Sequence, residues 1–125
     1  MIMSEKKDIT TEEDIKNMVD TFYDKVNVDI LLSPVFNDFA GVDWKHHLPK
    51  MYAFWNFLIL GIPGYKGQPF PMHTRLPITQ EHFNKWVKLF LKNIDEHFSG
   101  SNAELAKSKA ESIALTFQYK MGLLK

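Results

Sequence analysis

The chain has 125 residues, of which 45% are hydrophobic and 14% aromatic, so we expect one domain over residues 1–125 with an aromatic core. Fifteen basic residues balance fifteen acidic ones, and this neutral total argues against a nucleic acid or anionic lipid partner. The absence of cysteine excludes disulfides, thiolate nucleophiles and cysteine-bound metal sites.

The first ten residues are polar, and we expect residues 1–10 to form a mobile extension without the apolar core of a signal peptide. The densest apolar stretch, residues 54–60, is too short to cross a bilayer, so we expect a cytoplasmic protein with no membrane partner.

Thr10 and Glu13 have the spacing of a capping box at the start of a helix. Apolar residues then recur at helical spacing and predict the buried face of this helix: Ile15, Met18, Val19, Phe22, Tyr23 and Val26.

The segment from residue 27 to 42 contains Ser33 and Pro34 and predicts short turns. Asp43 then predicts the cap of a second long helix. Five residues of this helix share one stripe: His47, Met51, Phe54, Trp55 and Leu58. Because a proline ring clashes with the carbonyl four residues earlier, Pro49 predicts either a helix start near His47 or a kink in the first turns.

Residues 61–77 contain four prolines and three glycines, which predicts a functional loop. A third helix begins at Ile78 or Thr79 and ends at Ser99 and Gly100. Ser101 and Glu104 predict a second capping box. The last helix has an apolar face of Leu105, Ala106, Ala110, Ile113, Ala114 and Phe117. No segment alternates as a strand does, so the predicted class is all-α with roughly four main helices.

Several stretches resemble one protein family. They are Phe22-Tyr23-Asp24-Lys25-Val26, Pro34-Val35-Phe36-Asn37, Trp44-Lys45-His46-His47 followed by Phe54-Trp55, Gly67-Gln68-Pro69 through His73, and residues 83–90. This pattern, from about residue 15 to 118, is similar to the truncated haemoglobins, whose fold is a two-over-two helical sandwich enclosing haem. The absence of adjacent glycines favours the third group of that family. Pro49 is not a feature that the family requires.

The resemblance implies that His73 is the proximal ligand of the iron in haem b, iron protoporphyrin IX. On its residues alone, His73 would more readily be interpreted as a loop histidine exposed to water. Arg75 and Lys66 would pair with the haem propionates, although a solvated charge is the plain alternative for each.

The family also implies that Tyr23, His47 and Trp86 surround the distal ligand position. A hydroxyl or indole donor there stabilises bound dioxygen by roughly 1 to 3 kcal/mol, because the ligand carries partial negative charge. Each of these residues has a competing interpretation as an ordinary core residue. Helical spacing places His47 on the apolar stripe and directs His46 away from it.

Apolar residues would form the walls of the haem site: Phe36, Phe39, Phe54, Leu76, Phe83 and Phe90. Most of them would belong to the core even without haem. His82 and His97 are expected to face solvent.

The resemblance therefore implies a five-coordinate haem that binds O2, NO and CO in a polar pocket. The resemblance leaves two functions open: reversible binding of oxygen, and catalysis that acts on dioxygen together with nitric oxide or peroxide. Because tight retention of dioxygen would hinder its delivery, sensing, scavenging or redox chemistry is favoured over transport. Because the chain has no G-x-G-x-x-G and no P-loop, a separate reductase or small electron donor would supply electrons. The sequence lacks an H-E-x-x-H zinc motif, and a haem-free helical binding or regulatory module is the other alternative. We expect a monomer or a weak homodimer.

Overall fold

The computed structural model describes residues 6–39, 41, 43–65 and 78–123. The elements in these ranges are α1 (Glu12–Asn27), the short π-helix η1 (Val35–Phe39), α2 (Trp44–Leu60), α4 (Gln80–His97) and α5 (Ser101–Lys120). These ranges contain helices and no strand, which confirms the predicted all-α class. None of the described helices combines the length and the apolar character that crossing a membrane requires.

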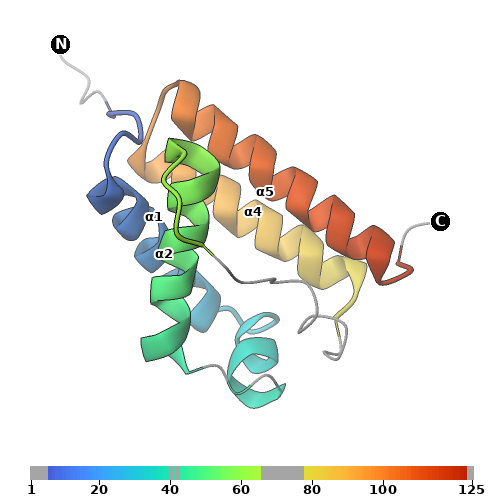
Figure 1. The fold of residues 1–125 in the computed structure, drawn as a ribbon. Helices are drawn as coiled ribbons and strands as arrows, with labels where there is room; N and C mark the ends of the chain where they lie inside the picture. The colour runs from blue at the N-terminus through green and yellow to red at the C-terminus, as the bar shows by residue number, and fades with distance from the viewer. Residues whose placement is uncertain (1–5, 40, 42, 66–77, 124–125) are drawn as a thin grey trace, which may run out of the picture.

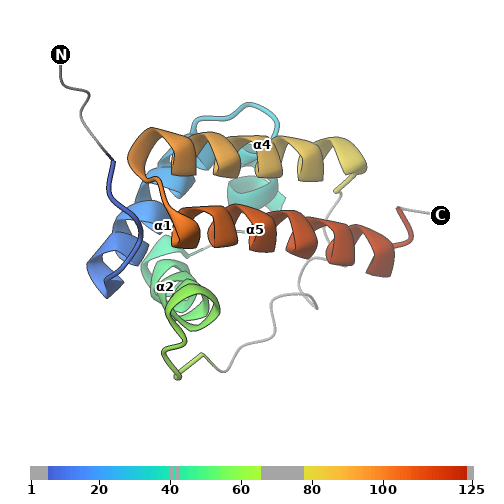
Figure 2. The same cartoon turned by 90° about the horizontal axis from the view of Figure 1, so that it is seen from above.

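The four long helices form two crossing pairs. Helices α4 and α5 run antiparallel and side by side, and α2 crosses them steeply (Figures 1 and 2). Helix α1 contacts both α2 and α4, while α5 contacts both α2 and α4. This closed set of contacts is a two-over-two sandwich in which each helix buries one face.

The buried face of α1 confirms the six residues predicted from helical spacing: Ile15, Met18, Val19, Phe22, Tyr23 and Val26. Asn93 of α4 is fully buried beside them, and its amide donates to the Met18 carbonyl oxygen at 3.0 Å. Lys25 donates to the Asn93 side-chain oxygen at 3.0 Å and pairs with Glu96 at 2.9 Å. These polar contacts fix α1 against α4, because a buried amide is costly unless both its donor and its acceptor are used.

The predicted first capping box is wrong by one residue. The helix cap is Thr11, whose side chain accepts from the Asp14 amide, and the Asp14 carboxylate accepts in return from the backbone of Thr11 at 3.1 Å. The same carboxylate binds Lys7 at 2.7 Å and the Thr10 amide at 3.0 Å. Asp14 therefore fulfils the role expected of Glu13. Its carboxylate accepts hydrogen bonds from the segment before the helix, and residue spacing alone does not reveal these contacts.

Helix α2 begins at Trp44, with Asp43 as the predicted cap accepting from the Lys45 amide at 3.2 Å. The alternative start near His47 is therefore wrong. Pro49 lies inside the helix, where it has no N–H to donate to the Lys45 carbonyl. Helical structure nonetheless continues to Leu60 and ends at Gly61, whose φ of 69° is the left-handed conformation that glycine favours at a helix end.

The predicted Ser101–Glu104 capping box is also wrong. Asp8 caps α5 instead, accepting from the backbone amides of Asn102 at 3.0 Å and Ala103 at 2.8 Å. Ile9 beside it is fully buried. Of the expected mobile extension, residues 1–5 lie outside the described residues, whereas Lys7, Asp8 and Ile9 are held against the α4–α5 junction.

The predicted apolar face of α5 is correct at Ala106, Ala110 and Ala114, which are buried. Leu105 is 37% exposed, so its assignment to the core is wrong. Ala103 takes that place, because it lies three residues before Ala106 on the same side of the helix.

Candidate functional site

Tyr23 lies at the meeting point of three elements. Its side chain is only 7% exposed, and its ring contacts Phe36 of η1 and the Trp44 and His47 rings of α2, with centroid separations of 6.0, 5.1 and 5.7 Å. Burial raises the pKa of the Tyr23 hydroxyl well above its ordinary value, so the group remains protonated at neutral pH. Tyr23 is therefore a hydrogen-bond donor held in an aromatic cluster.

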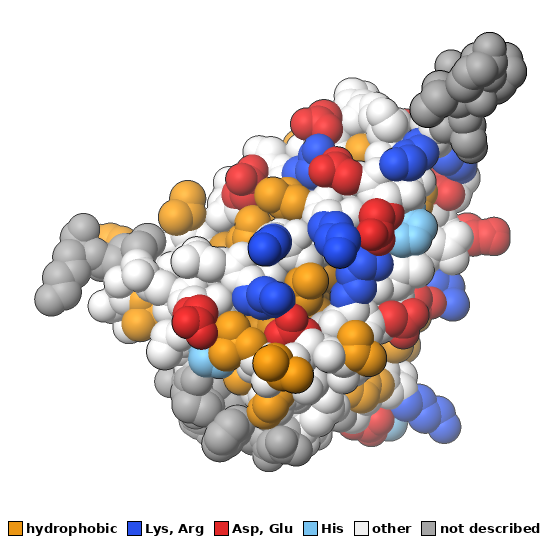
Figure 3. Space-filling view, turned by 180° about the vertical axis from the view of Figure 1, so that it is seen from behind, with side chains coloured by type: hydrophobic (Ala, Val, Ile, Leu, Met, Phe, Trp, Pro, Cys, Tyr) orange, Lys and Arg blue, Asp and Glu red, His pale blue; other side chains and the backbone are white. Residues whose placement is uncertain are grey.

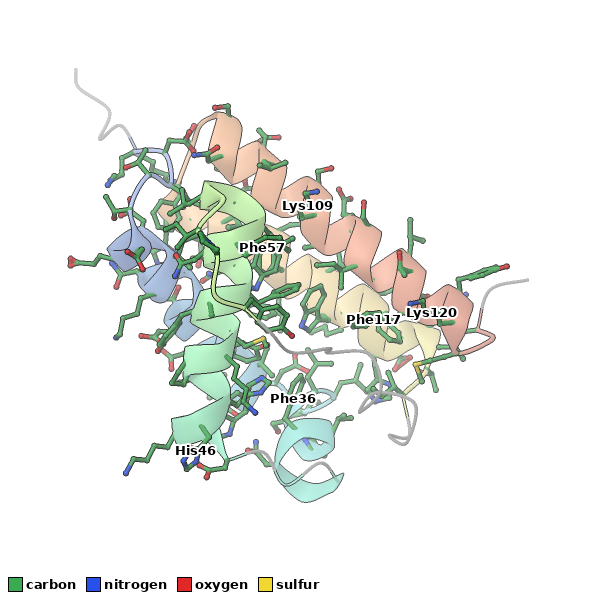
Figure 4. The ribbon with its side chains drawn as sticks, in the orientation of Figure 1. Phe36, His46, Phe57, Lys109, Phe117 and Lys120 are labelled. Atoms are coloured by element: carbon green, nitrogen blue, oxygen red, sulfur yellow. The ribbon has the colours of Figure 1, made fainter. Side chains whose placement is uncertain are left out.

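The two neighbouring histidines of α2 separate as the helical spacing predicts. His47 faces inward and meets Tyr23 edge to face at an interplanar angle of 81°. His46 is directed outward, with a 76% exposed side chain and its Nδ1 at 2.6 Å from Asp43 (Figure 4). Of the two, His47 alone touches the aromatic cluster, as its helical spacing predicts, and its role beside a bound ligand stays a prediction.

The inner face of α4 carries the third predicted donor. Trp86 stacks on Phe90 at 5.7 Å and meets Phe22 edge to face at 5.5 Å. Phe90 is 1% exposed and also stacks on Trp55 of α2, while Phe83, about two turns earlier on α4, is 6% exposed. Phe22 contacts the Tyr23 ring at 5.0 Å as well, so it joins the Trp86 side of the site to the Tyr23 side.

Trp44 is a member of the cluster to which the sequence analysis assigned no role. Its ring stacks on Phe36 at 5.8 Å and contacts both Tyr23 and His47. Its indole N–H donates to the Asn37 side-chain oxygen at 2.8 Å. The available signal was its position three residues before His47, which places both on one side of α2.

Two predicted wall residues occupy different ends of the site. Phe36 projects from η1 toward α2, as Figure 4 shows, and contacts the cluster around Tyr23. Phe54 lies further along α2, where it meets Trp55 at 5.4 Å and Tyr65 at 5.1 Å. The structure therefore brings Phe36 to Tyr23 and places Phe54 against the segment that follows α2.

A surface pocket of about 370 Å³ lies between α1 and α2. It is lined by Asp20, Tyr23, Asp24, Asn27, Trp44, Leu48 and Tyr52. The Tyr52 hydroxyl donates to Asp20, which also pairs with Lys16 at 3.1 Å. Burial and the Asp20 carboxylate raise the pKa of Tyr52 to about 12. Its carboxylates make this pocket unsuited to a porphyrin face, which requires apolar walls.

Several predicted site residues lie outside the described residues: Lys66, His73, Arg75 and Leu76. The side chain of Phe39 is outside them as well. The predicted proximal ligand, the propionate partners and two wall residues, Phe39 and Leu76, therefore stay predictions.

The described residues fit a haem on two counts. Phe36, Met51, Phe54 and Trp86 pack against the core and still keep part of their apolar surface exposed, which a flat apolar ligand would cover. Tyr23 and Trp86 also provide an O–H and an N–H donor, which is the chemistry that a polar ligand at the iron requires.

Comparison with known proteins agrees with this geometry. Residues 7–121 match the model of a family described as bacterial-like globin. The chain is 35% identical to the group 3 truncated hemoglobin ctb of Campylobacter jejuni over 94% of this chain and 98% of that protein. The crystal structure of a group III truncated hemoglobin from Campylobacter jejuni superposes with a TM-score of 0.83 at 34% identity, covering 93% of this chain and 94% of that one.

Proposed function

Because the chain belongs to the bacterial-like globin family as a group 3 truncated haemoglobin, we propose that it holds haem b through His73 and binds dioxygen, nitric oxide and carbon monoxide. Membership in the globins implies haem-based gas binding in general. Residues 1–125 would form a single globin domain, with haem b as its cofactor and these gases as its ligands.

The observation that carries the proposal is the convergence of Tyr23, His47 and Trp86 from three helices on one aromatic cluster. When bound, haem supplies an iron atom that takes a diatomic ligand at its sixth position. The Tyr23 hydroxyl and the Trp86 indole N–H would donate to that ligand, and His47 would lie beside them at the entrance from α2. Their aromatic neighbours limit the access of water, which strengthens such hydrogen bonds.

His73 would ligate the iron, and its second ring nitrogen would donate to a carbonyl oxygen. Arg75 and Leu76 follow closely in the sequence and would provide a propionate partner and a wall residue. Phe36, Phe54, Phe83 and Phe90 would complete the apolar walls.

The donors around the gas also suit chemistry in which negative charge develops on oxygen. Conversion of nitric oxide or peroxide would consume electrons, and the sequence has no motif for a nicotinamide or a nucleotide. We therefore place the electron source in a separate protein or a small reductant.

A hemin titration tests the proposal directly. The purified chain should take up one equivalent of hemin with a Soret band, and its reduced form should shift that band on addition of carbon monoxide. A chain that takes up no hemin would instead be the haem-free helical module. The Trp86→Phe variant should take up hemin equally well, because Phe90 and Phe22 still pack on the substituted ring.

A further inference from the structure

The outer face of α4 carries a row of lysines. Lys85, Lys88 and Lys92 follow one another at intervals of three and four residues, which places them on one side of the helix. Lys25 reaches the same side from α1, because its ammonium group binds Asn93 and Glu96 of α4. Figure 3 shows basic side chains gathered in the middle of this rear face. These four lysines are called the rear lysine cluster below.

Acidic residues neutralise only part of the rear lysine cluster. Lys85 pairs with Asp29 at 3.3 Å and Lys25 pairs with Glu96 at 2.9 Å. Lys88 and Lys92 are exposed and make no contact ion pair with a described carboxylate, while Lys25 and, less strongly, Lys92 lower the pKa of Glu96. Asp95, also on α4, is occupied by Lys107 at 2.7 Å. Lys88 and Lys92 therefore form a small positively charged area, with Glu81, Asp95 and Glu96 at its edges on the same helix.

Two large apolar side chains border this charge. Val28 is 81% exposed and Ile30 is 94% exposed, and they flank Asp29, which is tied to Lys85. The loop that carries them runs behind α4, along the upper edge of Figure 2. Hydrophobic side chains also lie among and below the basic ones in Figure 3. Exposed apolar residues next to a positively charged area are typical of a surface that docks a protein partner.

The opposite face of α4 lines the proposed haem site. Phe83, Trp86 and Phe90 face inward, and Lys85 is the direct neighbour of Trp86 in the chain. A helix with its side chains is roughly 10 to 12 Å across, so a protein seated on the rear lysine cluster would be separated from the inner face of α4 by about that thickness. This placement brings an outside partner close to the site without blocking it.

We propose that the rear lysine cluster, with Val28 and Ile30, docks an acidic one-electron redox protein that reduces the haem. The inference rests on the proposed function, since it identifies the surface that receives the external electrons. In each encounter the partner's reduced centre loses one electron and ferric haem iron becomes ferrous, and no bond forms or breaks. Weak electron-transfer contacts are small and depend on charge, so a few exposed lysines beside Val28 and Ile30 suffice for such a contact.

A reduced plant-type [2Fe–2S] ferredoxin serves as the acidic probe. Its affinity for the hemin-loaded chain is measured by calorimetry, and the rate of haem reduction by stopped-flow absorption, at low and at high ionic strength. Both should fall as salt rises, because the steering charges are exposed. The Lys88→Glu/Lys92→Glu variant should bind the ferredoxin at least about tenfold more weakly and be reduced correspondingly more slowly.

The matched control is Lys45→Glu/Lys50→Glu, which makes the same change in net charge on exposed positions of α2. It should retain most of the affinity. Equal losses in the two double variants, or no loss in either, would overturn the proposal, because the docking would then depend on net charge alone or occur elsewhere. Ile30→Ser should weaken binding at high salt, where the apolar contact dominates.

Haem loading is read from the Soret band before ferredoxin is added. A chain that takes no hemin contradicts the proposed function on that spectrum alone. A chain that loads hemin but binds ferredoxin independently of Lys88 and Lys92 contradicts only the docking surface.

Discussion

The rings of Tyr23 and His47 meet edge to face with their centroids 5.7 Å apart and their planes at 81°. The two residues come from different helices, and the contact holds the hydroxyl-bearing ring of α1 against the imidazole of α2. Trp44 packs against both rings at 5.1 and 5.5 Å. The distal side of the proposed site is therefore a packed unit in which the donors have fixed neighbours.

Replacing Tyr23 by phenylalanine should leave haem uptake intact and speed the release of dioxygen about 10- to 100-fold, because one hydrogen bond to a partly charged ligand is lost. Stopped-flow displacement of dioxygen by carbon monoxide measures this rate. The matched control is Tyr52→Phe, which removes a hydroxyl bound to Asp20 in the surface pocket. Equal release rates in wild type and Tyr23→Phe would contradict the role assigned to Tyr23.

Replacing Trp86 by phenylalanine removes the indole N–H and keeps a ring that stacks on Phe90. We expect roughly tenfold faster dioxygen release with little change in the free energy of unfolding. The two effects of Tyr23→Phe and Trp86→Phe should not add, because donors to one ligand are coupled. If Trp86→Phe and wild type release dioxygen at the same rate in parallel measurements, Trp86 has only a structural role.

The helix faces could be predicted because they depend on local spacing. Residues Ile15 through Val26 and the division of His46 from His47 follow from 3.6 residues per turn, and the structure agrees with both. The helix caps could not be predicted in the same way. Asp8 caps α5 from 94 positions away at Asn102, and such a long-range contact leaves no spacing pattern.

The site was predicted less completely than the fold. Tyr23 contacts both Phe36 and His47. Trp44 joins the same cluster and was missed, although its position three residues before His47 places both on one side of α2. The positions of His73 and its neighbours depend on the resemblance to truncated haemoglobins, because a proline-rich segment has no periodicity from which to argue.

Gly100 should tolerate no side chain. A Cβ there would lie 2.5 Å from the Asp8 Cγ, at a φ of 137°. We expect Gly100→Ala to lower the free energy of unfolding by about 3 kcal/mol, from backbone strain together with displacement of the α5 cap. Urea denaturation measures the loss.

Gly64→Ala is the control for this clash, because Gly64 has a φ of 135° and open space around its Cβ position. It should show the strain without the clash and lose clearly less stability. Equal losses in the two variants would mean that contact with Asp8 contributes nothing.

The Asp14 carboxylate should make the free energy of unfolding depend on pH in the acid range. Burial raises its pKa, but the Lys7 ion pair and the amides of Thr10 and Thr11 outweigh burial and lower the pKa to about 2. Because the folded pKa lies below the ordinary value of 3.8, the unfolded chain binds more protons in this range. The stabilisation, about 2 kcal/mol, is present above pH 3.8 and is lost as the pH falls through about 2.

Urea unfolding of wild type and Asp14→Asn between neutral and acid pH tests this assignment. The variant should be less stable at neutral pH, and the difference should shrink on acidification. Glu111→Gln, an exposed change on α5, should leave the pH profile unaltered. A difference that stays constant down to pH 2 would show that Asp14 acts through packing rather than through its charge.

The most direct measurement is the absorption spectrum of His73→Ala after reconstitution with hemin, recorded oxidised, reduced and with carbon monoxide. His97→Ala is its control, because His97 is exposed and its Nδ1 lies 2.9 Å from the Asn93 carbonyl oxygen within α4. We predict that His97→Ala keeps the wild-type Soret band and that His73→Ala loses it or binds hemin far more weakly. An unchanged Soret band in His73→Ala would contradict the assignment of the iron ligand.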